Sequence, residues 1–338
     1  MNAILLLVFR RVLVSVVILL IVSALLFCIL RLLPVDPAAM SMPPTATIAE
    51  IEAKRREMGL HLPLPQQYAI WLGHALRGDF GTSIHFRRSV VQLVMSSLPA
   101  TVELALLAMV IASVLGLGGG LLLFHMRGRR VCEQILDLAS ITLLSIPEFL
   151  WALFLILVFG VWLEALPFTG RLSSEFQRPV VSGFLLLDTL LVGRPDMFWD
   201  CVRHMLLPSL ALGVAFSPTI MRVLRSSLLD VYQEDYIQQA RLRGQSEWRI
   251  LLRHGLKNAI LPTLSLMGVQ FGFLFGGTLL VEVIFSYPGL GSLTVDAVRN
   301  ADLPIIQAVG LAYCVVVLVI NTAVDACYLV LNPRVRVA

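Results

Sequence analysis

One stretch near the start of the chain reads VLVSVVILLIVSALLFCIL, from Val12 to Leu30. It contains no charged residue, and a helix needs about 20 such residues to cross the hydrocarbon core of a bilayer. Five more apolar stretches follow it: Leu104–Phe124, Leu138–Leu163, Met205–Met221, Ala259–Val281 and Leu303–Val324. The stretch Leu138–Leu163 is interrupted only by Pro147 and Glu148. The pattern predicts an all-α polytopic membrane protein with six transmembrane helices.

The composition of the whole chain favours the same class of protein. Of its 338 residues, 58% are hydrophobic and 14% are charged, and the mean hydropathy is +0.85. Soluble globular domains contain roughly 25% charged residues. Much of the surface is therefore expected to face membrane lipid. The net charge of +4 is small, and no basic run is interleaved with aromatic residues. We therefore expect no nucleic-acid partner.

The distribution of Lys and Arg predicts the orientation, because cytoplasmic loops of membrane proteins carry an excess of basic residues. Arg10 and Arg11 precede the first span, and seven basic residues lie between Arg222 and Lys257. The segment Glu282–Pro304 contains only one basic residue, Arg299. These counts place both termini in the cytoplasm.

The predicted spans divide the chain into parts with different roles. The parts are a cytoplasmic N-terminus with the first span (1–31), an extracytoplasmic insert (32–100), a five-helix core (101–331) with a cytoplasmic loop (222–258), and a cytoplasmic tail (332–338). Within the insert, the periodicity predicts helices at Ile48–Leu60, after Thr47, and at Gln66–Leu76. The short run Val181–Val192 contains Asp188 and is expected to lie at the interface or to pack on other helices.

Motifs for nucleotide binding and catalysis are missing from the sequence. It has no G-x-x-x-x-G-K-[ST] loop, no H-E-x-x-H and no G-x-S-x-G. It also has no C-x-x-C pair for metal or redox chemistry. The glycines at 116, 118, 119 and 120 lie inside a span and predict close helix packing. We therefore expect no enzyme activity, no metal site and no cofactor bound by this chain.

Two short segments outside the spans carry more specific information. The cytoplasmic loop reads DYIQQARLRG from Asp235 to Gly244 and LRHGLKNAILP from Leu252 to Pro262. Its apolar periodicity is helical, and Gly244 is expected to end one helix, with Ser246 as the N-cap of the next. Because Ala240 and Gly244 are small and one turn apart, they are expected to let the helix approach another surface closely.

The second segment follows the fifth span and reads EVIFSYPGLG, from Glu282 to Gly291. Pro288 and Gly289 suit the centre of a type II turn, because Pro fixes φ and Gly accepts positive φ. Phe285 and Tyr287 are expected to form an aromatic anchor at the membrane interface.

These two segments resemble the dipeptide/oligopeptide/nickel permease family of ABC importers, and the chain looks most like the first subunit of a dipeptide permease. The loop positions that fit the family are Asp235, Tyr236, Ala240, Gly244, His254, Asn258 and Pro262. The outer positions that fit are Glu282, Phe285, Ser286, Tyr287, Pro288, Gly289 and Gly291. Further matches reach the closing segment Asn332–Arg336. The chain has Gln238-Gln239-Ala240 where the wider superfamily begins with Glu-Ala-Ala.

The resemblance implies a type I ABC importer permease fold in a bacterial inner membrane, with a peripheral first span. It implies a second homologous permease subunit and two cytoplasmic ABC ATPases, which carry ATP-Mg and dock on the loop. A periplasmic or lipid-anchored solute-binding protein would deliver the solute, and relatives carry dipeptides, oligopeptides, glutathione, nickel chelates or metallophores. The alternative is an ion-gradient-driven secondary transporter. That class predicts paired broken helices and clustered intramembrane carboxylates or histidines, which the sequence does not display.

Ionisable residues inside a span are functional candidates. Glu148 follows Pro147 in the interrupted third span, and both are candidates for the translocation pathway. Glu148 has three possible roles: lining the pathway, accepting a hydrogen bond from backbone freed by Pro147, and pairing with a partner subunit. Glu103 and Asp325 lie near span ends and are expected to face headgroups or interfaces.

Overall fold

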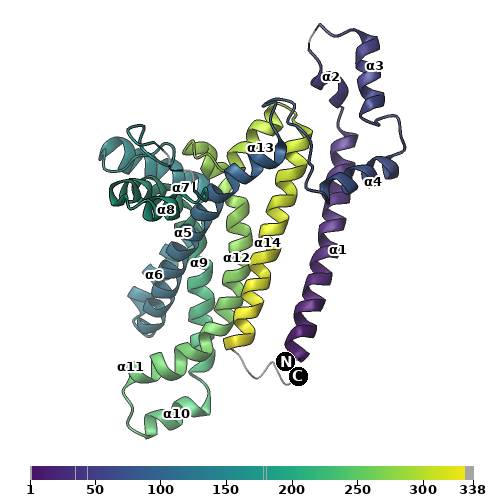
Figure 1. Ribbon diagram of the computed structural model, residues 1–338. Helices are drawn as coiled ribbons and strands as arrows, with labels where there is room; N and C mark the ends of the chain where they lie inside the picture. Colours follow the sequence, from purple (N-terminus) through teal and green to yellow (C-terminus); the bar gives the residue numbers. More distant parts are fainter. Residues whose placement is uncertain (1, 35, 44, 178, 180, 332–338) are drawn as a thin grey trace. The chain divides into compact units, whose positions relative to one another are not determined.

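The computed structural model describes residues 2–34, 36–43, 45–177, 179 and 181–331. Over this part of the chain the protein is helical, and its only strand-like pairing is one bridge between Thr82 and Ser89. The predicted tail 332–338, with the segment Asn332–Arg336, lies outside the described residues. The elements, in order, are α1 (Asn2–Leu32), α2 (Pro37–Ser41), α3 (Ile48–Glu57), α4 (Leu64–Ala75), α5 (Val90–His125), α6 (Arg130–Ser145), α7 (Glu148–Leu155), the π-helix η1 (Ile156–Trp162), α8 (Leu185–Leu191), α9 (Pro195–Val231), α10 (Asp235–Leu242), α11 (Glu247–Ile250), the π-helix η2 (Leu251–Gly255), α12 (Leu256–Ile284), α13 (Leu290–Arg299) and α14 (Leu303–Leu331) (Figure 1).

Five helical segments in the described chain are long and apolar enough to cross a membrane. They are Arg10–Leu32, Val90–His125, Pro195–Val231, Glu247–Ile284 and Leu303–Val324. The third predicted span, Leu138–Leu163, falls on α6 and the α7–η1 rod, which meet at an angle of 98°, a bend found both in broken spans and in re-entrant loops. Proline prevents the helix from continuing, and the residue before it avoids helical geometry. Accordingly, Ile146 is extended, with φ −92° and ψ 118°, immediately before Pro147.

The contacts divide the chain into two compact units. One unit comprises Met1–Pro99 and Gly289–Leu318. Its apolar core joins the first turns of α5 to α13 and α14 through Val90, Leu290, Ile305 and other side chains. In the segment predicted as an insert, α3 begins at a capping box formed by Thr47 and Glu50, and α4 corresponds to the second predicted helix. Tyr68 and Trp71 of α4 pack against Phe27 of α1, with ring centroids 5.6 Å apart in both cases.

The other unit comprises Ala100–Pro288 and Val319–Ala338, and α9 is its central helix. Helices α6, α7, α8 and α12 all contact α9. Close packing of α5 on α9 depends on glycine, as predicted: a Cβ added at Gly116 would lie 2.6 Å from the Ile220 Cβ. Gly119 and Gly120 are similarly close to α9, whereas Gly118 faces open space and its predicted packing role is wrong.

Candidate functional site

The segment between α9 and α12 folds into two short helices, α10 and α11, which we call the α10–α11 hairpin (residues 235–255). It lies beyond one end of α9 and α12 (Figure 1). The turn has φ +72° at Gly244, a conformation that glycine adopts without steric cost. The Gly244 N–H donates to Arg241 O at 2.9 Å, and the Gln245 N–H donates to Ala240 O at 3.3 Å. This pair of bonds is a Schellman motif, which satisfies the last carbonyls of α10.

The inner face of the hairpin is apolar. Ala240 is buried with Ile237 and Ile250, and Val231 and Tyr232 pack against them. The small side chain of Ala240 therefore allows α10 to approach α11 within the same chain. A Cβ added at Gly244 would meet nothing within 4 Å, so that position is open on its outer side. Ser246 is the N-cap of α11, as predicted, but its side chain makes no capping hydrogen bond.

Polar contacts tie the hairpin to the start of α12. The Asn258 amide donates to the Tyr236 hydroxyl at 2.8 Å and to His254 O at 3.2 Å. His254 Nε2 lies 3.1 Å from Gln245 Oε1, next to the turn. Five of the seven loop positions singled out in the sequence (Tyr236, Ala240, Gly244, His254 and Asn258) thus belong to one folded unit. Asp235 begins α10, and Pro262 lies inside α12, where it cannot donate a hydrogen bond to Asn258 O.

A second connection runs from the hairpin to α5. Tyr232, at the end of α9, packs edge-on against Phe124 of α5, with ring centroids 4.6 Å apart. The Arg127 guanidinium lies 3.7 Å from the Phe124 centroid and 4.8 Å from the Tyr232 centroid. Sequence reasoning missed this cluster, because Tyr232 is more than 100 positions from Phe124 and Arg127 in the chain and no motif links them.

The outer face of the hairpin exposes large apolar side chains. Leu242 is 89% exposed and Trp248 is 63% exposed, and Leu252 is also exposed. Both Leu242 and Trp248 lie outside the residues singled out in the sequence. The sequence could have pointed to them, because each is an apolar residue in a charged stretch and neither fits the helical spacing of the buried residues. Exposed apolar patches on folded proteins mark interaction surfaces.

The predicted type II turn at Pro288-Gly289 is wrong. Gly289 is extended, with φ −110° and ψ −170°, because it is the N-cap of α13. The left-handed residue is Ser286, with φ +49°. Its N–H donates to Val283 O and the Tyr287 N–H donates to Glu282 O, so α12 also ends in a Schellman motif.

The predicted aromatic anchor is also wrong as a surface feature. Phe285 and Tyr287 are fully buried within the chain. Glu282, in the last turn of α12, is buried too, and its carboxylate accepts a hydrogen bond from the Thr101 hydroxyl at 2.6 Å. Burial raises the pKa of the Tyr287 phenol above its usual range. The segment Glu282–Gly291 therefore packs into the protein interior through these three side chains.

Glu103 was expected to face headgroups or interfaces, but it is buried within the chain. Its carboxylate is buried in an ion pair with Arg171 and also accepts the Leu186 N–H at 2.8 Å. Leu186 lies in α8, the short helix within the run predicted to be interfacial or packed. Asp188 of α8 is fully buried, whereas Leu187, Leu190 and Leu191 are exposed, so one face of that run packs on the protein. The side chain of Asp325 lies outside the described part of the structure.

The candidate pathway residues lie at the break between α6 and α7. Glu148 is the first residue of α7, and a Cβ added at Gly277 of α12 would lie 3.4 Å from its Oε1 atom. The structure gives Glu148 no hydrogen bond or ion pair with any described residue. A bond to backbone freed by Pro147 is therefore not formed. Among the described residues, no group of three His, Cys, Asp or Glu side chains is arranged to hold a metal.

Five long apolar helices, one bent helix pair and a folded hairpin beyond the helix ends are the architecture of a polytopic membrane protein. The chain belongs to the family of binding-protein-dependent transport system inner membrane components, whose sequence profile matches residues 112–337. The profile for the N-terminal part of such components matches residues 4–105. Members are permease subunits of ABC importers, and separate subunits hydrolyse ATP.

Several characterised proteins are similar over almost their whole length. The di/tripeptide transport system permease protein DppB of Pseudomonas aeruginosa (strain UCBPP-PA14) is 37% identical over 93% of this chain and 94% of its own. The glutathione transport system permease protein GsiC of Escherichia coli (strain K12) is 36% identical over 97% and 98%. A solved structure of the MetNI methionine ABC transporter has a similar fold. Its TM-score is 0.56 at 15% identity, covering 71% of this chain and 97% of that one.

Proposed function

We propose that this chain is the permease subunit through which an ATP-driven importer moves small peptides across the inner membrane. The α10–α11 hairpin is the observation that carries the proposal, because it is a folded unit with exposed Leu242 and Trp248 beyond the ends of two spans. Relatives named for di/tripeptides and for glutathione support small peptides as the solute class. Free peptides of this size share an amino group, a carboxylate and amide bonds.

The proposal places the hairpin and both termini in the cytoplasm. The seven basic residues between Arg222 and Lys257 support this orientation through the positive-inside rule. A second permease subunit would complete the pathway. Two ABC ATPases with ATP-Mg would dock on the hairpins of the two permeases, and an external binding protein would deliver the peptide.

Movement of the hairpin would be transmitted to three spans. Its polar tie to α12 runs through Tyr236 and Asn258, and its aromatic tie to α5 runs through Tyr232 and Phe124. It is continuous with α9 through residues 232–234. Closure of the ATPases would therefore displace α5, α9 and α12 together, and this is the coupling that alternating access requires.

Glu148 is our candidate for a residue that lines the pathway. Its carboxylate has no internal partner in the described structure and lies beside Gly277 of α12. A negative charge at this place would attract the amino group of a peptide. Glu148→Gln is expected to alter the preference among peptides that differ in charge. Unchanged preference and unchanged rate would remove Glu148 from the pathway.

Uptake into proteoliposomes tests the main proposal. The chain is reconstituted with its partner subunits, and ATP-dependent entry of a labelled dipeptide and of glutathione is measured beside ATP hydrolysis. Uptake without ATP would contradict the proposal. Gly244→Glu and Trp248→Glu should insert normally yet separate hydrolysis from uptake. The matched control, Glu175→Gln, changes an exposed residue far from the hairpin and should transport normally.

A further inference from the structure

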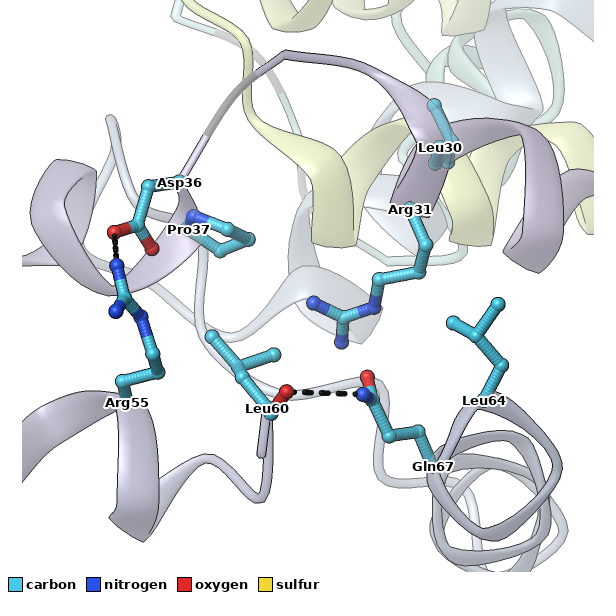
Figure 2. Close-up of a pocket in the computed structure, with 8 residues that line it drawn as sticks. All are labelled: Leu30, Arg31, Asp36, Pro37, Arg55, Leu60, Leu64 and Gln67. Carbon is cyan, nitrogen blue, oxygen red and sulfur yellow. Dashed lines mark hydrogen bonds and ion pairs between the residues drawn. The ribbon is translucent and has the colours of Figure 1, made fainter. Parts of the chain in front are cut away.

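A cavity of about 330 Å³ lies at the end of α1. Eight residues between positions 30 and 67 line it: Leu30, Arg31, Asp36, Pro37, Arg55, Leu60, Leu64 and Gln67 (Figure 2). All eight belong to one compact unit, in which α1, α2, α3 and α4 each contribute a wall. Three of the eight side chains are ionisable: Arg31, Asp36 and Arg55.

One positive charge in this cavity is left without compensation. Asp36 and Arg55 neutralise each other through a contact of 2.6 Å, and Arg55 also pairs with Glu52 at 2.8 Å. Arg31 makes no hydrogen bond or ion pair with any described residue, and its Nε atom is enclosed. Its guanidinium lies 5.2 Å from the centroid of the Phe27 ring, which is its only aromatic contact in the described chain.

The cavity also contains a hydrogen-bond acceptor without a donor. The Gln67 amide nitrogen donates to Leu60 O at 3.2 Å and to Leu62 O at 2.8 Å, and these two bonds fix the orientation of the amide. Its Oε1 atom is consequently directed away from those carbonyls and is buried without a partner in the described structure. Figure 2 shows the Arg31 guanidinium and this amide extending toward the same space, with the Asp36–Arg55 pair on the other side.

The position of the cavity indicates which anion is available. The apolar part of α1, Arg10–Leu32, has 23 residues and is therefore about 35 Å long, enough to cross a hydrocarbon core of about 30 Å. Only 11% of its most apolar window is buried inside the described chain, which leaves the rest of this helix surface open to lipid. Arg31 lies one residue before the end of this span. That is the depth at which phospholipid phosphates begin, in whichever leaflet this end of α1 lies.

We propose that this cavity binds the headgroup of a membrane aminophospholipid such as phosphatidylethanolamine. The phosphate accepts charge-assisted hydrogen bonds from Arg31, because a guanidinium matches phosphate oxygens in geometry and charge. The primary ammonium donates to Gln67 Oε1 and lies in the field of the Asp36 carboxylate. One zwitterionic ligand thus provides partners for both groups that the protein leaves unpaired. The site is separate from the proposed coupling hairpin and does not depend on transport.

Lipid titration by native mass spectrometry tests the proposal on the full chain purified with its partner subunits and stripped of lipid. Phosphatidylethanolamine is compared with phosphatidylcholine, whose quaternary ammonium has no proton to donate to Gln67. The unaltered protein should bind phosphatidylethanolamine more tightly. Arg31→Gln should weaken this binding by at least about tenfold, the lower limit expected for losing hydrogen bonds to a charged group.

Two further variants separate the contacts. Arg31→Lys keeps the charge and should retain part of the affinity. Gln67→Leu should abolish the preference for phosphatidylethanolamine while phosphate-dependent binding persists. If Arg31→Gln fails to fold, these two variants carry the test. Arg77→Gln removes an exposed cation of the same segment that does not line the cavity, and it should bind as the unaltered protein does.

Several results would overturn the assignment. Equal affinity in Arg31→Gln and the unaltered protein would show that Arg31 reaches bulk solvent or pairs with Gln67 itself. Equal losses in Arg31→Gln and Arg77→Gln would reduce the effect to general surface charge. Displacement of the lipid by millimolar inorganic phosphate would assign the cavity to a soluble anion instead of a lipid.

Discussion

Gly244 and Ser286 occupy the same backbone conformation for the same reason, since each follows the end of a helix and closes a Schellman motif. Glycine adopts this conformation freely, and serine adopts it against the steric preference of L-residues. The expected role of Gly244 as a helix terminator matches this geometry. The strain at Ser286 was not expected, because the sequence offered Gly289 only three residues later.

Gly244→Ala should weaken the hairpin without creating a clash. Its added Cβ would meet nothing within 4 Å, so the cost arises from backbone conformation alone and should be about 1 kcal/mol. Hydrogen exchange of the α10 amides measures the loss. Gly118→Ala is the matched control, because Gly118 is helical and also has open space around it. An unchanged exchange rate in Gly244→Ala would contradict the left-handed conformation of Gly244 in the Schellman motif.

Asp188 should make the outer segment sensitive to acid. Its burial alone would raise the pKa of the carboxyl, but hydrogen bonds from Ser182 and from the N–H groups of Val181 and Gly183 lower it below the ordinary value. A depressed pKa means that the carboxylate stabilises the fold above its unfolded pKa of about 3.9. This contribution is lost as the pH falls through the lower, folded value.

Limited proteolysis of the segment 164–204 as a function of pH measures this effect. Protection should fall below about pH 4, the range set by the unfolded pKa of an aspartate. Asp188→Asn should reduce protection at neutral pH and flatten the pH response. Asp196→Asn is an unsuitable control, since Asp196 pairs with Arg194. Asp230→Asn, an exposed position outside the segment, should leave the profile unchanged.

At the scale of the element, one arginine adds ion pairs to the packing of α6 on α9. Arg225 of α9 contacts both Glu133 and Asp137 of α6, and its bond to Asp137 measures 2.6 Å. The two carboxylates are four residues apart and so lie on one face of α6. Because Pro147 interrupts the backbone between α6 and α7, this fork stabilises the position of the first half of the span.

Arg225→Gln should therefore lower the stability of the protein in detergent by about 1–3 kcal/mol, the range for hydrogen bonds to charged groups. Thermal unfolding provides the measurement. Arg249→Gln removes an exposed arginine of the hairpin and should change little. A shift of the same size in both variants would mean that net charge, and not the fork, determines the result.

At the scale of the whole molecule, buried polar contacts join segments that are far apart in the chain. Glu103 and Arg171 are 68 positions apart, and both side chains are at most 7% exposed. Their ion pair and the Leu186 N–H bond fasten the segment around α8 to α5. The attachment of this segment to α5 therefore depends on the ion pair. Removing Glu103 would leave the buried charge of Arg171 without compensation.

Glu103→Gln should destabilise the protein by about 3 kcal/mol, because it leaves the Arg171 guanidinium buried without an anion. The double variant Glu103→Leu/Arg171→Met should lose less, since it removes both charges. The stability of the two variants is compared by unfolding them in detergent and following the fluorescence. Glu175→Gln, an exposed position in the same segment, is the control. If the double variant were less stable than the single one, the pair would contribute more than its burial costs.

The sequence alone determined the spans, the loop motif and the family resemblance. Spans follow from transfer free energy summed over about 20 consecutive residues, which any reader of the chain can evaluate. The end of α10 at Gly244 likewise follows from one local residue preference. These features depend on neighbours in the chain. The structure reproduces the helix end at Gly244 and five of the six spans, and it bends the third predicted span by 98°.

Tertiary structure alone decided which polar and aromatic side chains lie inside. Phe285 and Tyr287 read as an interface anchor, and Glu103 read as a headgroup contact, yet all three are buried. Likewise, Ala240 packs within the hairpin, and Arg31 and Gln67 meet at one cavity. Burial depends on which segments, distant in the chain, pack together in the fold. The type of a single residue does not specify that packing.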